Sequence, residues 1–302
     1  MKVLVTGGAG FIGSHLVDRL LENDFKVVVL DNLHRGKLKN IQKHIDMGKI
    51  EFIDGDIRDY DTVMGAVQNC DTIYHLAAQS NVMGAVSDLD YSFSTNVIGT
   101  FNMLKASHES GVRRFIFSSS REAYGEAQYL PVDEMHPLSS KNTYGASKVA
   151  GEKYCEVFQN MSSMEVVILR FANVYGERDI DRVIPIFLRN VANGKDIHIY
   201  GGNQIIDFIS VHTVIDILIQ SSDNKKALQG PTNVGSGKST TLFDLANRIM
   251  ELSGSKQKVI VDPPRSIEVI KFTADIGRMQ DIFYFTEIND SLSYLNEMII
   301  RE

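Results

Sequence analysis

The chain has 302 residues, of which 43% are hydrophobic and 23% are charged, which is the composition of an ordinary globular protein. The net charge of −7 argues against a nucleic-acid partner, and no uninterrupted apolar run is long enough to span a membrane. The two cysteines, Cys70 and Cys155, have no metal-binding spacing, and no signal peptide precedes the first motif. We therefore expect a cytoplasmic protein with no membrane partner and no metal site.

Short runs of β-branched residues alternate with longer amphipathic stretches in the first half of the chain. The runs predict strands at Lys2–Thr6, Lys26–Asp31, Ile50–Asp54, Thr72–Leu76, Arg114–Ser118 and Val166–Arg170. The stretches predict helices at Ile12–Leu21, Tyr60–Val67, Thr95–Ser107 and Tyr144–Phe158. Because the strands lack alternation, both of their faces are expected to be buried, and we predict an α/β fold with a Rossmann-like, doubly wound parallel sheet.

The regular alternation stops after Asn173. From there to about Gly202 we expect mainly loops, with a helix around Pro185–Asn193 and then a strand at Ile205–Val211. Further helices are expected at Val214–Ser221, at Thr241–Leu252 and from Tyr294 onward. We predict a dinucleotide-binding domain at 1–173 that also receives about 205–236. The remaining segments, 174–204 and 237–302, would form a smaller, interleaved substrate-binding lobe with a cleft between the two parts.

A glycine-rich turn follows the first predicted strand and opens a helix. Gly7 permits the tight turn, Gly10 lets the backbone approach a pyrophosphate, and Gly13 allows close packing of the helix on the strand. The helix start, which contains Phe11 and Ile12, would direct its N–H groups at the phosphates. Because the turn opens the first βαβ unit, a dinucleotide site is favoured over a plain turn.

Acidic residues follow the second and third predicted strands. An acid at Asp31, with Asn32 beside it, can bind both ribose hydroxyls of NAD and would repel the 2′-phosphate of NADP. The nearby Arg35 and Lys37 leave a residual NADP preference open. Further cofactor contacts are expected from Asp56, Ile57, Leu76, Ala77 and Ala78, although the two alanines are also explained by core packing. We predict NAD as the cofactor.

Tyr144 and Lys148 stand four residues apart in a predicted helix, so their side chains share one face. A nearby cation favours the phenolate over the phenol, and the pair predicts a general base for a hydroxyl proton. This spacing also arises by chance in long chains, so the prediction depends on the other motifs.

Several motifs follow one another along the chain: Thr6–Gly13, His75–Ala78, Asn96, Ser118–Ser120, Tyr144-x-x-x-Lys148 and Arg170–Gly176. In this order and spacing they resemble the extended short-chain dehydrogenase/reductase superfamily, over nearly the whole chain. Within it the chain is most similar to the nucleotide-sugar epimerase/dehydratase family, and closest to enzymes of the UDP-glucose 4-epimerase type.

The resemblance implies a set of roles. Tyr144 would take the proton of the sugar 4-hydroxyl while hydride leaves C4 for the nicotinamide, and Ser120 would hydrogen-bond that hydroxyl. Lys148 would bind the nicotinamide ribose and hold Tyr144 as a phenolate. The 4-keto intermediate would then rotate and take the hydride back on its other face.

The resemblance also implies binding residues and partners. The cofactor site would include Asn96, Ser118 and Phe171 in addition to the residues above. The substrate, expected to be a UDP-sugar, would meet Ser80, Ser120, Glu122, Tyr144, Asn173, Arg182, Val183, Arg265 and Glu268. A homodimer is expected through the helices around Thr95–Ser107 and Tyr144–Phe158.

Two segments depart from the family pattern. Glu122 stands where sugar dehydratases and decarboxylases carry a glutamate near C5, but Arg121 replaces the acid that a dehydratase uses on its leaving hydroxyl. Ile206 stands where the family usually carries an arginine for the diphosphate, which leaves Arg182 and Arg265 as candidates. A 4-epimerase is therefore the first hypothesis. A dehydratase or decarboxylase that uses Glu122, and a non-catalytic NAD-binding protein, remain as alternatives.

The segment around Lys238 resembles the end of a phosphate-binding P-loop. Thr232 stands where that motif requires its first glycine, so we predict an ordinary connection between a strand and a helix there.

Overall fold

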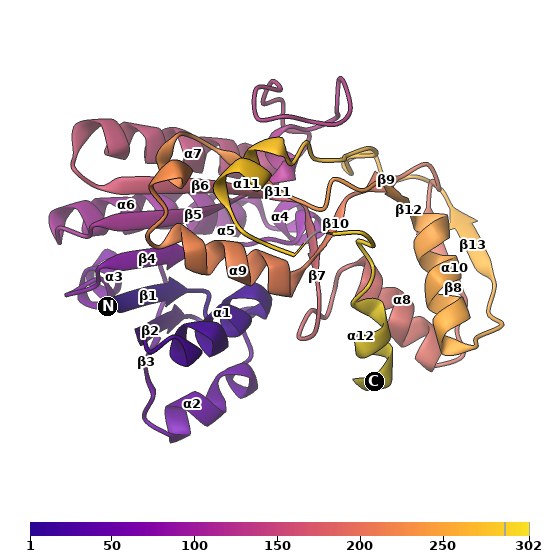
Figure 1. The fold of residues 1–302 in the computed structure, drawn as a ribbon, viewed down its shortest axis with the longest axis horizontal. Coiled ribbons are helices and arrows are strands. Elements are labelled where there is room, and N and C mark those ends of the chain that lie inside the picture. Colours follow the sequence, from indigo (N-terminus) through magenta and orange to yellow (C-terminus); the bar gives the residue numbers. More distant parts are fainter. Residues whose placement is uncertain (287, 302) are drawn as a thin grey trace.

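Seven parallel strands form the central sheet of the protein, and the computed structural model describes residues 1–286 and 288–301 (Figure 1). The strands lie in the order β3, β2, β1, β4, β5, β6, β11. Their bounds are Lys2–Thr6 (β1), Lys26–Asp31 (β2), Ile50–Asp54 (β3), Thr72–His75 (β4), Arg114–Ser120 (β5), Glu165–Phe171 (β6) and Thr232–Val234 (β11). The strand order reverses between β1 and β4, so the expected doubly wound, Rossmann-like sheet is confirmed, and ligands of such sheets bind at this reversal.

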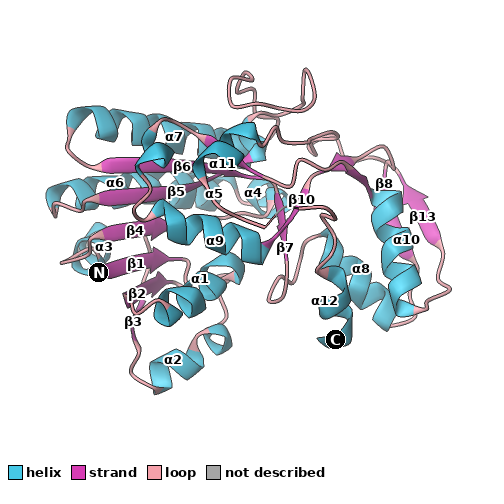
Figure 2. Ribbon diagram, viewed as in Figure 1, coloured by secondary structure: helices cyan, strands magenta, loops and turns pink. Residues whose placement is uncertain are grey.

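Helices cover both faces of the sheet, as Figure 2 shows. One face carries α1 (Phe11–Glu22), α9 (Val211–Ser221) and α11 (Gly277–Ile282), and the other carries α3 (Tyr60–Ala66), α6 (Thr100–Glu109) and α7 (Thr143–Met161). Neighbouring strand residues enter opposite cores, since Val3 and Val5 belong to one cluster and Leu4 to the other. This double burial explains why the strands are apolar without alternation.

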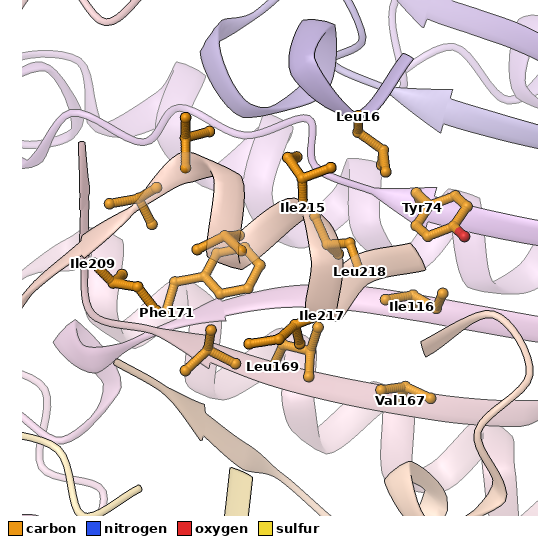
Figure 3. Close-up of a cluster of buried hydrophobic side chains, with 14 of the residues drawn as sticks. Leu16, Tyr74, Ile116, Val167, Leu169, Phe171, Ile209, Ile215, Ile217 and Leu218 are labelled. Atoms are coloured by element: carbon orange, nitrogen blue, oxygen red, sulfur yellow. The ribbon is translucent and has the colours of Figure 1, made fainter. Parts of the chain in front are cut away.

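The core beneath α9 holds the C-terminal part of the large domain on the sheet (Figure 3). Ile217 and Leu218 of α9 are fully buried, and so are Ile116 of β5 and Leu169 of β6 in the same cluster. Burying one such side chain contributes about 1.5–3 kcal/mol. This core therefore holds α9, which follows the first segment of the smaller lobe in the chain, against the central sheet.

The smaller lobe lies to the right in Figure 1. It contains α8 (Val183–Ala192), α10 (Leu242–Ser253) and α12 (Leu295–Arg301), and the parallel pair β8 (Ile197–Tyr200) and β13 (Val259–Asp262). Two further pairs are β7 (Asn173–Tyr175) with β10 (Phe208–Ser210), and β9 (Ile205–Ile206) with β12 (Thr240–Thr241). The expectation of mainly loops from Asn173 to about Gly202 is thus partly wrong. This segment contains β7 and β8, which are too short for a hydrophobic pattern to reveal them. The domain limits themselves stay a prediction.

The single strand expected at Ile205–Val211 is divided at Asp207. The Asp207 carboxylate is fully buried and accepts hydrogen bonds from the backbone N–H groups of Ser236, Gly237 and Ala274, at 2.8, 3.0 and 3.0 Å. A buried carboxylate needs such donors, and they turn the chain out of the strand. The loop before Lys238 therefore directs its N–H groups at Asp207, as an ordinary connection does.

The helix expected at Thr95–Ser107 begins as a π-helical turn, Ser94–Gly99, which α6 then continues. A Cβ on Gly99 would lie 2.6 Å from the Ile57 side chain, so glycine is needed for the helix to pack this closely. Single π turns inside helices are frequent at functional sites. This turn presents Asn96 toward the end of β4.

Several short helices have no counterpart in the prediction: α2 (Gln42–Asp46), α4 (Val82–Ser87), α5 (Leu89–Phe93) and the 3₁₀ turns Leu38–Asn40, Arg121–Ala123 and Lys225–Leu228. They are too short for helical periodicity to identify them. Within the described residues, no helix combines the length and the apolar character that a membrane span requires.

Candidate active site

The glycine-rich turn after β1 forms the floor of a cleft. Gly7 has φ of +70°, and a Cβ there would lie 2.9 Å from the Ala77 nitrogen. A Cβ on Gly13 would lie 2.2 Å from the carbonyl oxygen of Gly7. Both positions therefore require glycine, and the bare backbone they leave at the start of α1 is a cradle that fits the pyrophosphate of a dinucleotide.

Asp31 lies at the end of β2 beside the same cleft. Its carboxylate accepts hydrogen bonds from the backbone N–H groups of Ala9 at 2.9 Å and Leu33 at 2.8 Å. Burial raises the pKa of this carboxyl group, and these two hydrogen bonds oppose the rise. The Arg35 guanidinium forms an ion pair with Asp181 and donates to the Ser80 hydroxyl, so it is already engaged with residues other than Asp31.

Most of the predicted cofactor residues line this first cleft: Gly7, Gly10, Phe11, Ile12, Gly13, Asp31, Asn32, Ile57, Leu76, Ala77 and Ala78. Asp56 and Asn96 do not. Asp56 bonds to the side chains of Arg58 and Asn32, which lowers the pKa of its carboxyl group to about 2 against the opposing effect of burial. Asn96 is buried and bonds to the backbone of Gln79 and the hydroxyl of Ser147.

A second cleft adjoins the first. The two share Arg35, Leu76, Ala78, Ser80, Asp181 and Arg182 along their border. The second cleft contains the remaining predicted residues: Ser118, Ser120, Glu122, Tyr144, Lys148, Phe171, Asn173, Val183, Arg265 and Glu268. The fold thus brings together the ends of β5 and β6, the start of α7 and the smaller lobe around one space.

Tyr144 and Lys148 enter the second cleft from the first turns of α7. The Asn142 side chain accepts a hydrogen bond from the Gly145 N–H at 2.9 Å and so caps this helix. The Lys148 ammonium donates to the carbonyl oxygen of Ser118 at 2.8 Å and lies 5.7 Å from the centre of the Tyr144 ring. Burial lowers the pKa of Lys148 to about 8.

The acidity of Tyr144 is set by several groups. Burial raises the pKa of the phenol, while the Arg182 cation, a hydrogen bond with the Ser120 hydroxyl and the Arg35 cation lower it. The negative charge of Glu122 raises it. Arg182 and Arg35 are thus two cations besides the expected Lys148 that lie near enough to favour the phenolate.

The Ser120–Glu122 segment carries a small network. Arg121 makes an ion pair with Glu122, with 2.9 Å between Nη2 and Oε1, and its Nε donates to Oδ1 of Asn173 at 2.5 Å. The Asn142 side chain donates to Oε2 of Glu122 at 2.7 Å. Glu122 therefore pairs with Arg121. This pairing is the alternative to a role for Glu122 in chemistry at C5 of the sugar.

Arg182 and Arg265, the candidates for the role of the arginine absent at Ile206, both line the second cleft. Arg182 bonds to Asp179 at 3.1 Å and lies 5.4 Å over the Phe11 ring, on the border of the two clefts. Arg265 lies 3.7 Å over the Tyr200 ring and pairs with Glu268 at 3.1 Å. Either guanidinium group can bind a diphosphate if it gives up its present carboxylate partner, Asp179 for Arg182 and Glu268 for Arg265.

Sequence reasoning missed several lining residues, among them His34, Tyr91, Arg178, Ile180, His198, Tyr200, Gln204 and Leu242. They lie in loops, in the short helix α5 or in the smaller lobe, where no motif points to them. Among the described residues, no group of three or more His, Cys, Asp or Glu side chains is placed to hold a metal ion.

Comparisons with known proteins agree with this arrangement. The sequence model of the NAD dependent epimerase/dehydratase family matches residues 3–235. A putative UDP-glucose 4-epimerase of Methanocaldococcus jannaschii is 38% identical over 95% of this chain and 94% of its own length. The solved structure of a Thermotoga maritima UDP-glucose 4-epimerase with UDP-glucose covers 100% of this chain and 99% of its own, with a TM-score of 0.91 and 31% identity. A Streptomyces venezuelae dTDP-glucose 4,6-dehydratase solved with NAD covers 99% and 96%, with a TM-score of 0.92 and 26% identity.

The sheet, the glycine cradle and the second cleft define a dinucleotide-binding α/β protein with serine, tyrosine and lysine at its ligand site. The chain belongs to the NAD dependent epimerase/dehydratase family. It is an enzyme of that family, and its cofactor is NAD, which Gly7, Gly13 and Asp31 are placed to hold.

Proposed function

We propose that the protein is a nucleotide-sugar 4-epimerase that acts on a UDP-hexose of the UDP-glucose and UDP-galactose type. The observation that supports this most is the position of Ser120, Tyr144 and Lys148 around one cleft that adjoins the cofactor cleft. The similarity to proteins named UDP-glucose 4-epimerases points the same way.

In this proposal each side chain acts at a stated atom. Tyr144 takes the proton of the sugar 4-hydroxyl, and Ser120 holds that hydroxyl by a hydrogen bond. NAD supplies the acceptor for the C4 hydride and returns it to the opposite face of the 4-keto sugar. Lys148, fixed to the Ser118 carbonyl, orients the ribose next to the nicotinamide. The proton held by Tyr144 returns to O4 in the last step.

The dehydratase and decarboxylase alternative depends on Glu122. Both carboxylate oxygens of Glu122 are already engaged, Oε1 in an ion pair with Arg121 and Oε2 in a hydrogen bond from Asn142. An adjacent cation favours the ionised carboxylate and so makes Glu122 a weaker base, which favours epimerisation. The complete Ser120, Tyr144 and Lys148 set argues against a non-catalytic NAD-binding protein.

Arg182 and Arg265 are the residues we propose for the substrate diphosphate. Both line the second cleft at the smaller lobe. Arginine binds phosphate oxygens through two parallel N–H donors, which suits this task. Glu268, now paired with Arg265, would then be free to bind a ribose hydroxyl.

We also propose a homodimer. Apolar side chains of α5, the π turn, α6 and one face of α7 are exposed together on the described surface, at Phe93, Ile98, Phe101, Tyr154, Val157 and Met161. Phe101 and Tyr154 contact each other, with 5.3 Å between ring centres, so the two helices form one surface. Contiguous exposed apolar surface of this kind is typical of an interface.

The test is incubation of the purified protein with UDP-glucose, followed by NMR of the sugar products. A galactose sugar supports the proposal. A 4-keto-6-deoxy sugar, or a pentose from the corresponding uronic acid, would support the alternative chemistry. No turnover of any of several nucleotide sugars would contradict both.

A further inference from the structure

Arg121 occupies an unusual position for a cation in the second cleft. It follows Ser120 in the chain, and its side chain is only 13% exposed. It holds Glu122 through Nη2 and Asn173 through Nε, so one guanidinium group ties the 3₁₀ turn after β5 to the start of β7. The ring of Phe272 lies 5.8 Å from its central carbon and covers its face.

Glu122 has little freedom to move away from this pair. Its side chain is 7% exposed. A Cβ on Gly145 would lie 2.2 Å from the backbone oxygen of Glu122, so the start of α7 presses directly on this residue. Arg121 Nη2 forms an ion pair with Oε1 at 2.9 Å, and the Asn142 side chain donates to Oε2 at 2.7 Å.

The Glu122 carboxylate nevertheless lies close to the proposed chemistry. It lines the same cleft as Ser120 and Tyr144, and its charge acts on the Tyr144 phenol. A sugar that presents its 4-hydroxyl to Tyr144 brings the neighbouring C5 into the same region. When C4 becomes a ketone, the C5–H bond becomes acidic, and a free carboxylate there is a hazard.

We propose that Arg121 determines the outcome of the reaction by holding Glu122 away from the sugar C5–H bond. This inference rests on the proposed function, because it concerns the fate of the 4-keto sugar. Arg121 is a positioning residue: it acts through Glu122. The charges of Arg121 and Glu122 also cancel, so this ion pair adds no net positive charge beside C6 of the sugar. Such a site fits a neutral hexose better than a sugar carboxylate.

Arg121 suppresses the removal of the C5 proton by Glu122. In that reaction the C5–H bond breaks, and a lone pair of the Glu122 carboxylate takes the proton to form an O–H bond. The electron pair of the broken C5–H bond forms the C4–C5 double bond, and the π pair of the C4 carbonyl moves onto O4 to give an enolate. In D₂O the protonated carboxyl exchanges with solvent, and its deuteron returns to C5 as the ketone re-forms. Deuterium at C5 therefore records this side reaction even when no new product accumulates.

The test measures C4 inversion and C5 exchange in the same NMR sample. Protein with bound NAD is incubated with UDP-glucose in D₂O. The wild type should give the C4 epimer with hydrogen retained at C5. Arg121→Ser removes the cation, and Arg121→Gln leaves a shorter, uncharged amide. Both should raise the C5 exchange rate relative to C4 inversion by roughly 100-fold, the scale of general-base catalysis.

The double variant Arg121→Ser, Glu122→Gln is the matched control. Its C5 exchange should fall back to the wild-type level, because the released base is gone. Rapid C5 exchange in the wild type, or retained C5 hydrogen in folded single variants that still turn over, would overturn the inference. Exchange that persists in the double variant would overturn it too. Absence of C4 inversion in the wild type would instead contradict the proposed function, so the two failures are distinguishable.

Discussion

Lys148 donates its hydrogen bond to the backbone of Ser118 at 2.8 Å, and its ammonium lies 5.7 Å from the centre of the Tyr144 ring. The lysine is thus fixed to the end of β5 and is not bonded to the phenol. Arg182 and Arg35, both on the border of the two clefts, lower the pKa of Tyr144 against the rise that burial causes. Control of the base therefore comes partly from the segment that leads into the smaller lobe.

Replacing Arg182 should change the pH dependence of turnover. Arg182→Met removes a cation that favours the phenolate, so the pKa of Tyr144 should rise. The limb of the profile in which kcat increases with pH should then move to higher pH. The measurement is kcat against pH at saturating UDP-glucose.

Arg248→Met is the matched control for this change. Arg248 is a partly exposed arginine of α10 that pairs with Glu251 and Asp290 and lines neither cleft. Its profile should match the wild type. A profile of Arg182→Met that is also unchanged would show that Arg182 does not act on the base.

His75 should make the fold sensitive to acid. Its ring is fully buried between the hydroxyls of Thr6 at 2.8 Å and Thr100 at 3.0 Å. Burial lowers the pKa of His75 to about 3. The unfolded chain binds this proton near pH 6.5 while the native state does not, so stability falls as pH drops below 6.5.

The corresponding measurement is urea unfolding at pH 7 and pH 5 with saturating NAD. The wild type should lose about 2 kcal/mol more than His75→Gln between these two values, from the shift of one buried histidine. Glutamine keeps a donor and an acceptor for the two threonines but does not titrate. Equal losses in the two proteins would mean that His75 contributes nothing to the acid sensitivity.

Gly13→Ala should abolish tight NAD binding, because the new methyl group would lie 2.2 Å from the Gly7 carbonyl oxygen in the cradle. Gly65→Ala is the control, since a Cβ at this position of α3 meets nothing within 4 Å. That variant should bind NAD normally and gain about 0.5–1 kcal/mol of stability from the better helix former. Titration of each protein with NAD, followed by thermal unfolding, measures both effects. Normal NAD affinity in Gly13→Ala would count against the cradle.

The proposed dimer should dissociate when charge is placed in the apolar surface. Ile98→Asp and Val157→Asp, at side chains that are 43% and 54% exposed, should shift the sedimentation coefficient to that of a monomer. Tyr284→Asp places the same charge at a side chain that is 91% exposed elsewhere, and it should leave the association unchanged. A wild type that sediments as a monomer would contradict the proposal directly.

Much of the fold was predictable because its signals are local. Strands β1, β2 and β3 begin and end where their apolar runs do, and α7 extends the expected Tyr144–Phe158 helix by only one residue at its start and three at its end. The glycine cradle was predictable because each glycine answers a steric demand of neighbouring backbone. The local part of this signal is the spacing of Gly7, Gly10 and Gly13, although Gly7 also has to let the distant Ala77 backbone approach.

The rest depends on contacts between distant segments. Asp207 divides a strand because Ser236 and Ala274 offer their N–H groups to it, which no local pattern reveals. The ion pair between Arg35 and Asp181 joins two loops that both line the cofactor cleft. Arg35, which the sequence offered as a contact for the 2′-phosphate of NADP, is therefore engaged by a distant residue.

The most direct test of the account follows the C4 hydrogen itself. UDP-glucose labelled with deuterium at C4 is incubated with the wild type and with Tyr144→Phe, and the products are analysed by NMR and mass spectrometry. The account predicts UDP-galactose that keeps the deuterium at C4 without exchange with water, and a loss of turnover of roughly 100- to 10,000-fold in Tyr144→Phe with NAD still bound. Deuterium lost to solvent during C4 inversion, or full activity in Tyr144→Phe, would contradict it.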